Sequence, residues 1–139
     1  MSQLSKKPKS DYRILIVDDE EILLNVMAEV LELDKYQVET VITGAQALNK
    51  IKANNYDLVI TDLSLTDIVG WDLADKIFIL NPDCKIILAT GWGLKIKKDH
   101  CEKHHINALL YKPFKMADIL EVVDNVLSGS REEVSVGTV

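Results

Sequence analysis

Cysteine and long apolar runs are both scarce in this sequence. The 139-residue chain has two cysteines, Cys84 and Cys101, which are far apart and form no CxxC pair. No apolar run approaches the roughly 18 residues that are needed to cross a bilayer. The first residues, MSQLSKKPKSD, lack the apolar core of a signal peptide. Two thiols without a secretion signal are typical of a reducing compartment, so we expect a cytoplasmic protein without a membrane segment.

The sequence also lacks an excess of positive charge. It has 16 basic and 22 acidic residues, which gives a net charge of −6. A surface of this sign repels nucleic-acid phosphates and anionic lipids, so direct binding to either by this domain is not expected. Hydrophobic residues make up 47% of the chain, which is enough for the core of one ordinary domain.

Short apolar runs alternate with longer segments that have helical spacing. We predict strands over 12–17, 36–41, 57–61, 85–89 and 108–111. We predict helices over 22–31, 44–53, 70–80, 93–105 and 119–127. This alternation implies right-handed strand–helix–strand units and a parallel sheet. Segments 1–10 and 129–139 have no such pattern, so we expect a flexible N-terminal tail, a domain over 11–128, and a C-terminal tail or the start of a linker.

Two patterns refine this outline. Four of the strand runs are almost continuously apolar, which indicates strands covered by helices on both faces. The run 36–41 instead alternates through Gln37 and Glu39, which favours the edge of the sheet. In the first helix, the apolar face is predicted to consist of Ile22, Leu23, Val26, Met27, Val30 and Leu31.

Polar side chains stand where four of the apolar runs end. Asp18 and Asp19 follow the first run, Asp62 the third, Thr90 the fourth and Lys112 the fifth. The carboxyl ends of parallel strands share one edge of a sheet, and ligands bind at that edge. We therefore expect three carboxylates, one hydroxyl and one ammonium group to converge from four places in the chain.

This set of groups favours phosphoryl chemistry with magnesium. Three clustered carboxylates raise one another's pKa, and the single charge of Lys112 compensates too little of that repulsion, so a divalent cation is the natural remedy. Oxygen ligands without histidine or cysteine favour Mg²⁺ over zinc. A carboxylate beside Mg²⁺ and a lysine can attack phosphorus and form an aspartyl phosphate, while the cations and a hydroxyl stabilise the transferring oxygens.

Four stretches now carry a family resemblance: ILIVDDEE, DLVITDLSLTDIVGWDL, IILATGW and LLYKPF. In this order and spacing they resemble the receiver domain of the two-component response regulators, over about residues 11–128. The resemblance implies a doubly wound α/β fold of the flavodoxin-like type, with a five-stranded parallel sheet in the strand order 2-1-3-4-5.

The resemblance also implies a signalling function. The domain would be a phosphoacceptor switch of a phosphorelay, fed by the phosphohistidine of a sensor histidine kinase or a phosphotransfer protein. Phosphorylation would change the surface of the fourth helix, fifth strand and fifth helix, and in this family it can be accompanied by formation of a homodimer. Such a domain is not an enzyme beyond its own phosphorylation and dephosphorylation. The cognate kinase and the output domain or target stay unknown.

The acceptor and metal roles fall on four residues under this resemblance. Asp62 is similar to the phosphoaccepting aspartate. Asp19 resembles the direct Mg²⁺ ligand and Asp18 the acid that acts through a bound water. Asp62 is also a metal ligand in this scheme, and the backbone carbonyl of Ser64 is a further ligand. The side chain position of Ser64 is in addition one that modulates the reaction.

The remaining implied roles concern the phosphoryl group and its surroundings. Thr90 and Lys112 resemble the hydroxyl and the lysine that contact the phosphoryl group, and Pro113 is a candidate for a cis peptide bond with the lysine. Leu109 stands where the family often has an aromatic switch residue, and Tyr111 lies on the same strand face. Trp92 occupies a position that faces the phosphoryl group in the family, and we expect its indole to slow hydrolysis.

Other interpretations of these residues remain open. Asp18 and Asp19 could cap the first helix, with Glu20 and Glu21 favouring its dipole. A magnesium-dependent phosphatase would need a second acid at Ser64, and an FMN carrier would need a phosphate loop in place of the acids. A degenerate receiver that only binds partners is disfavoured because all five site positions are filled.

Overall fold

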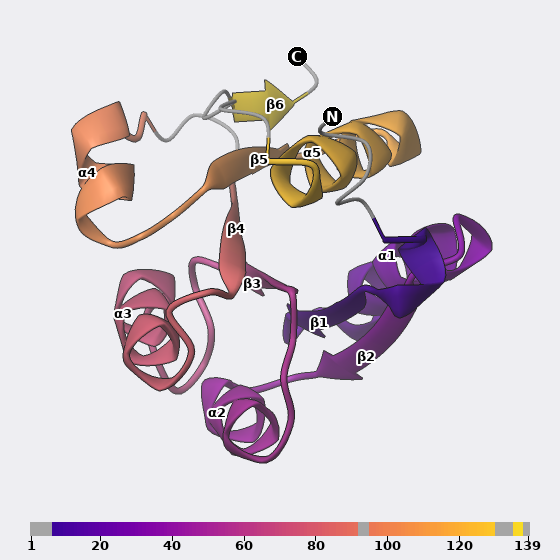
Figure 1. Ribbon diagram of the computed structural model, residues 1–139. Helices are drawn as coiled ribbons and strands as arrows, with labels where there is room; N and C mark the ends of the chain where they lie inside the picture. Colours follow the sequence, from indigo (N-terminus) through magenta and orange to yellow (C-terminus); the bar gives the residue numbers. More distant parts are fainter. Residues whose placement is uncertain (1–6, 92–94, 130–134, 138–139) are drawn as a thin grey trace.

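The computed structural model describes residues 7–91, 95–129 and 135–137. Its centre is a parallel sheet with the strand order β2-β1-β3-β4-β5-β6 (Figure 1). The strands are β1 (Arg13–Val17), β2 (Gln37–Val41), β3 (Leu58–Asp62), β4 (Lys85–Gly91), β5 (Ala108–Lys112) and β6 (Ser135–Gly137). The order of the first five strands is the expected 2-1-3-4-5, with the alternating strand β2 at the edge.

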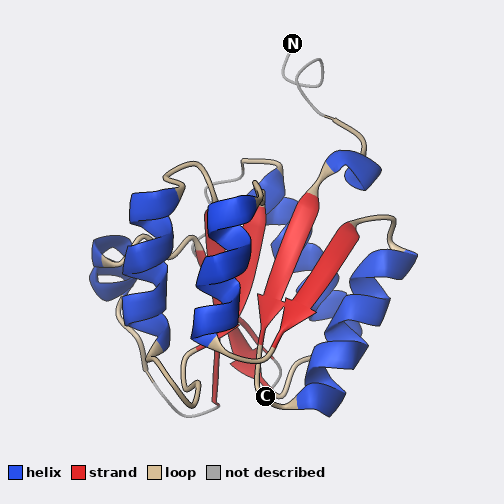
Figure 2. Cartoon of the chain, turned by 90° about the horizontal axis from the view of Figure 1, so that it is seen from below, coloured by secondary structure: helices blue, strands red, loops and turns tan. Residues whose placement is uncertain are grey.

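Helices cover both faces of this sheet (Figure 2). They are α1 (Glu21–Leu33), α2 (Gly44–Ala53), α3 (Gly70–Leu80), α4 (Lys98–Lys103) and α5 (Met116–Leu127), and a short 3-10 helix, η2 (Lys9–Asp11), precedes β1. Buried side chains form one apolar cluster under α2, α3 and α4 and another under α1 and α5. No helix among the described residues is long and apolar enough to span a membrane.

The central strands owe their position to their apolar runs. Ile14, Leu15, Ile16 and Val17 are all 0% exposed. Because successive strand residues point to opposite faces, Leu15 and Val17 join the cluster under α2, α3 and α4, whereas Ile14 and Ile16 join the other one. The prediction that this strand is covered on both faces is confirmed.

The predicted apolar face of the first helix is partly wrong. Ile22 is 84% exposed and Val26 is 38% exposed, whereas Leu24, Met27 and Leu31 are buried. The buried stripe of α1 therefore runs through Leu24, Met27 and Leu31, which are spaced by three and four residues as on one face of a helix. Ile22 lies off this stripe and faces the solvent.

Two more differences concern the ends of elements. The fourth helix covers Lys98–Lys103 and is shorter than the predicted 93–105, because Lys95 and Lys97 dilute the apolar face of the segment before it; residues 93 and 94 lie outside the described residues. Within 129–139, expected to be a tail or linker, residues 135–137 pair in parallel with β5, with Leu110 opposite Val136. Near the N-terminus, Lys9 Nζ in η2 lies 2.7 Å from Oδ2 of Asp34, the residue that follows α1.

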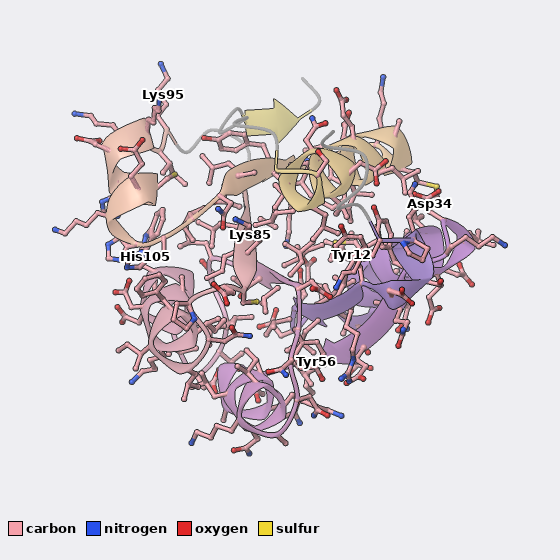
Figure 3. All side chains as sticks on the ribbon, in the orientation of Figure 1. Tyr12, Asp34, Tyr56, Lys85, Lys95 and His105 are labelled. Atoms are coloured by element: carbon pink, nitrogen blue, oxygen red, sulfur yellow. The ribbon has the colours of Figure 1, made fainter. Side chains whose placement is uncertain are left out.

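The three histidines lie between α3 and α4. His104 Nδ1 lies 3.0 Å from Asp75, and the ring of His100 meets Trp71 edge-on at 4.3 Å between centroids. His105, labelled where α4 approaches α3 in Figure 3, stacks on Phe78 at 3.6 Å. Its φ of 66° is left-handed, a conformation that His adopts more readily than most residues. These contacts fix α4 against α3.

Candidate functional site

The acids that follow the strands converge at the carboxyl edge of the sheet. Asp18 and Asp19 come directly after β1, and Asp62 is the last residue of β3. One carboxylate oxygen from each of these three residues lies within 4.8 Å of the others. The expected convergence is thus confirmed, and such an oxygen cluster suits a hard divalent cation.

Lys112, the last residue of β5, supplies a positive charge at the same edge. Its Nζ lies 3.1 Å from Asp18 Oδ2, 3.1 Å from Glu20 Oε1 and 3.4 Å from Asp62 Oδ1. Burial lowers the pKa of Lys112, but the attraction of Asp18 and Asp62 outweighs this effect and leaves the pKa raised. The ammonium group is therefore held in its charged form among the acids.

Burial has a clear effect on the pKa of Asp62. Burial raises the pKa of Asp62 and the charge of Asp18 adds to this, whereas Lys112 opposes it. The ionised carboxylate is consequently under-compensated by the protein, and an additional cation beside it would be bound favourably.

This shift predicts how stability depends on pH in the metal-free protein. Because the pKa of Asp62 is higher in the folded state, its contribution to stability is present at low pH and is lost as pH rises through the folded-state pKa. We expect Asp62→Asn to raise the urea midpoint near neutral pH, and this gain to shrink on acidification. A gain of the same size at all pH values would contradict this explanation.

Thr90 contributes a hydroxyl without a partner. The strand register places Ala89 opposite Asp62, so Thr90 lies one residue further along β4. Thr90 is 1% exposed, and its Oγ1 has no hydrogen-bond partner among the described residues. A buried hydroxyl in this state costs about 1–3 kcal/mol. Its position next to the acids fits a site that receives an oxygen-rich group such as a phosphoryl group.

The loop between β3 and α3 is fastened at several points. Asp67 accepts hydrogen bonds of 2.9 Å from the backbone N–H groups of Gly44 and Ala45 at the start of α2. These bonds hold the pKa of Asp67 below its usual value. Ser64 and Val69 form an isolated bridge that closes the loop. The backbone next to Asp62 is therefore fixed before any ligand binds.

Gly70 allows this loop to pack closely, which gives a testable prediction. A Cβ at Gly70 would lie 2.8 Å from Leu63 Cα and 2.9 Å from the carbonyl oxygen of Asp62, both backbone atoms. We expect Gly70→Ala to lower the free energy of unfolding by about 2 kcal/mol. Gly91→Ala is the control, because a Cβ there meets no described atom within 4 Å. Equal urea midpoints for the two variants would refute this view of the loop.

The other residues of the sequence hypothesis are placed as follows. The Lys112–Pro113 peptide bond is cis, as the resemblance implies. Tyr111 pairs with Thr90 in the strand register and is half-buried, whereas Leu109 is buried in the core. Trp92 lies outside the described residues. The roles assigned to these residues and to Ser64 stay predictions.

Two functional contacts were missed by the sequence analysis. Glu20 was interpreted as a helix residue that favours the dipole, yet its side chain makes no capping hydrogen bond and contacts Lys112 instead. Asp67 was not singled out at all. No local pattern could have revealed either contact, because the partners are 92 and 23 residues away in the chain.

Comparisons with known proteins agree with this geometry. The family model of the response regulator receiver domain matches residues 14–124. Among solved structures, a CheY-like response regulator receiver domain protein from Methanospirillum hungatei JF-1 is similar, with a TM-score of 0.78 and 32% identity over 84% of this chain and 93% of that chain.

Two of the curated relatives are longer proteins. The transcriptional regulatory protein CutR of Streptomyces coelicolor is 33% identical over 78% of this chain and 50% of its own length. The sensor histidine kinase RcsC of Escherichia coli is 30% identical over 89% of this chain and 13% of its own length. The chain thus spans half or less of these two relatives. It belongs to the response regulator receiver domain family, the phosphorylation switches of two-component signalling.

Proposed function

We propose that Asp62 is the phosphoacceptor of this receiver domain and that phosphorylation depends on Mg²⁺. The observation that carries this proposal is the meeting of three carboxylates within 4.8 Å beside a lysine and an unpartnered buried hydroxyl. An isolated helix cap would explain Asp18 and Asp19, but it would not explain the approach of Asp62 from another strand.

Asp18, Asp19 and Asp62 would hold the magnesium ion, with the backbone carbonyl of Ser64 as a further ligand. When bound, Mg²⁺ supplies positive charge that neutralises phosphoryl oxygens and offsets the repulsion among the acids. The fit rests on the donor set, which is made of hard oxygen atoms. The raised pKa of Asp62 supports it, because burial and the charge of Asp18 together outweigh the compensation by Lys112.

Asp62, Lys112 and Thr90 would act directly on the phosphoryl group. A carboxylate oxygen of Asp62 attacks phosphorus, and the bond between phosphorus and the donor nitrogen breaks, with the electron pair leaving on the donor imidazole. Lys112 pairs with a phosphoryl oxygen, and the Thr90 hydroxyl donates a hydrogen bond to another. The Thr90 contact would satisfy its unpartnered oxygen and give the domain two surface states.

The donor would be a phosphohistidine on a sensor histidine kinase or a phosphotransfer protein. Receiver domains are phosphorylated by histidine kinases, and one relative is itself a sensor histidine kinase. A cytoplasmic location belongs to the same proposal, and the free thiols of Cys84 and Cys101 agree with a reducing compartment.

A small donor with a phosphorus–nitrogen bond tests this function without the cognate kinase. The protein is incubated with phosphoramidate and Mg²⁺, and its intact mass is followed over time. We expect a gain of one phosphoryl group, followed by its loss through hydrolysis after the donor is removed. The absence of any gain would overturn the proposal.

A further inference from the structure

Lys112 has more acidic partners than the proposed chemistry uses. An ammonium group has three N–H donors, and three carboxylates surround this one. Asp18 and Glu20 each lie 3.1 Å from Nζ, and Asp62 lies 3.4 Å away. Asp18 and Glu20 accept hydrogen bonds from this ammonium group, so a phosphoryl oxygen on Asp62 has to compete with them for Lys112.

The three acids differ in how easily they can be released. The Asp18 side chain is 1% exposed, and its Oδ1 accepts a 2.8 Å hydrogen bond from the backbone N–H of Glu20. Asp62 is the acceptor itself. The Glu20 side chain is 65% exposed, so water can replace Lys112 as its partner at little cost. Of the two acids that accept hydrogen bonds from Lys112, Glu20 is thus the easier to displace.

Glu20 also has no other described role for its carboxylate. It is the N-cap residue of α1, yet its side chain makes no capping hydrogen bond. The side chain reaches instead across the site to the end of β5, 92 residues further along the chain. A residue that served only the helix would not need this contact.

We propose that Glu20 is a positioning residue of the phosphorylation site, which holds Lys112 until a phosphoryl group on Asp62 takes its place. The inference rests on the proposed function, because it requires Asp62 as the acceptor. The Glu20 carboxylate would then oppose phosphorylation in two ways: it competes for Lys112, and it adds a negative charge at the entrance for anionic donors.

Glu21 offers a matched control for the second effect. It is the first residue of α1, it is exposed and it carries the same charge, but it is not among the acids that pair with Lys112. A purely general effect of charge should therefore be similar for Glu20→Gln and Glu21→Gln, whereas competition for Lys112 should appear only in Glu20→Gln.

The test uses a rate and an equilibrium. The rate of phosphorylation by acetyl phosphate with Mg²⁺ is measured by intact mass, and the affinity for beryllofluoride, a phosphoryl analogue, is measured by tryptophan fluorescence. We expect Glu20→Gln to raise both by roughly threefold or more and Glu21→Gln to raise them clearly less. Equal effects of the two variants, or no effect of Glu20→Gln, would overturn the inference.

A double-mutant cycle with Lys112→Met shows whether Glu20 acts through the lysine. We expect Glu20→Gln to gain no more beryllofluoride affinity than Glu21→Gln does in the Lys112→Met background, and a larger gain for Glu20→Gln there would contradict the mechanism. Wild-type protein separates the two proposals. If it neither takes up phosphate nor binds beryllofluoride, both fail. If the wild type is phosphorylated and binds beryllofluoride, but Glu20→Gln and Glu21→Gln change the rate and the affinity equally, only the proposed role of Glu20 fails.

Discussion

Replacing Lys112 by methionine is expected to lower the free energy of unfolding of the metal-free protein by about 3 kcal/mol. Asp18 is 1% exposed and Asp62 is 13% exposed, and both contact this ammonium group. Removing one partner of a buried ion pair leaves the other charge without compensation, which costs far more than losing a surface pair. Methionine retains most of the aliphatic stem, so the loss reports mainly on charge.

Lys85→Met is the control for this substitution. Lys85 begins β4 and is exposed to solvent, so its replacement should change the urea midpoint very little. Mg²⁺ should restore part of the stability of Lys112→Met, because a cation can again compensate the acids. Equal loss in the two lysine variants, or a failure of Mg²⁺ to help, would show that Lys112 does not neutralise the cluster.

The removal of magnesium should have the largest effect on the chemistry. We expect EDTA to slow phosphorylation by acetyl phosphate roughly 100-fold, which corresponds to about 2.7 kcal/mol in the activation barrier. Asp19→Asn should have a similar effect with Mg²⁺ present, because it removes a proposed ligand. Asp72→Asn, an exposed acid in the first turn of α3, should leave the rate unchanged.

The same Asp19→Asn variant should move stability in the opposite direction. Its carboxylate lies in a cluster of like charges, so its removal from the metal-free protein relieves repulsion of up to about 1 kcal/mol. Mg²⁺ should then stabilise the wild type more than the variant. A variant that is less stable without metal, or one that binds Mg²⁺ as strongly as the wild type, would contradict the assignment of Asp19.

Much of the fold could be predicted because its causes are local. The apolar run of β1 requires cover on both faces, and the polar Gln37 and Glu39 favour an edge position for β2. Given parallel strands, the residues at the strand ends must meet at one edge. Asp18, Asp19 and Asp62 are therefore expected to lie together from the order of the strands alone.

The remaining features depend on partners that are distant in sequence. The burial of Leu24 in place of Ile22 depends on how α1 rotates against the sheet, and the pairing of residues 135–137 depends on the free edge of β5. The contact of Glu20 with Lys112 exists only once β1 and β5 lie at the same end of the sheet. Periodicity describes one element at a time, so it could not predict these contacts.

The assignment of Asp62 as the phosphoacceptor is tested most directly by locating the phosphoryl group in the chain. Protein treated with acetyl phosphate and Mg²⁺ is reduced with borohydride, which converts an aspartyl phosphate to homoserine, and is then digested and analysed by tandem mass spectrometry. Homoserine at position 62, absent from Asp62→Asn and present in Asp72→Asn, is the result that we predict. Homoserine at any other aspartate position, or phosphate uptake by Asp62→Asn equal to that of the wild type, would contradict the claim.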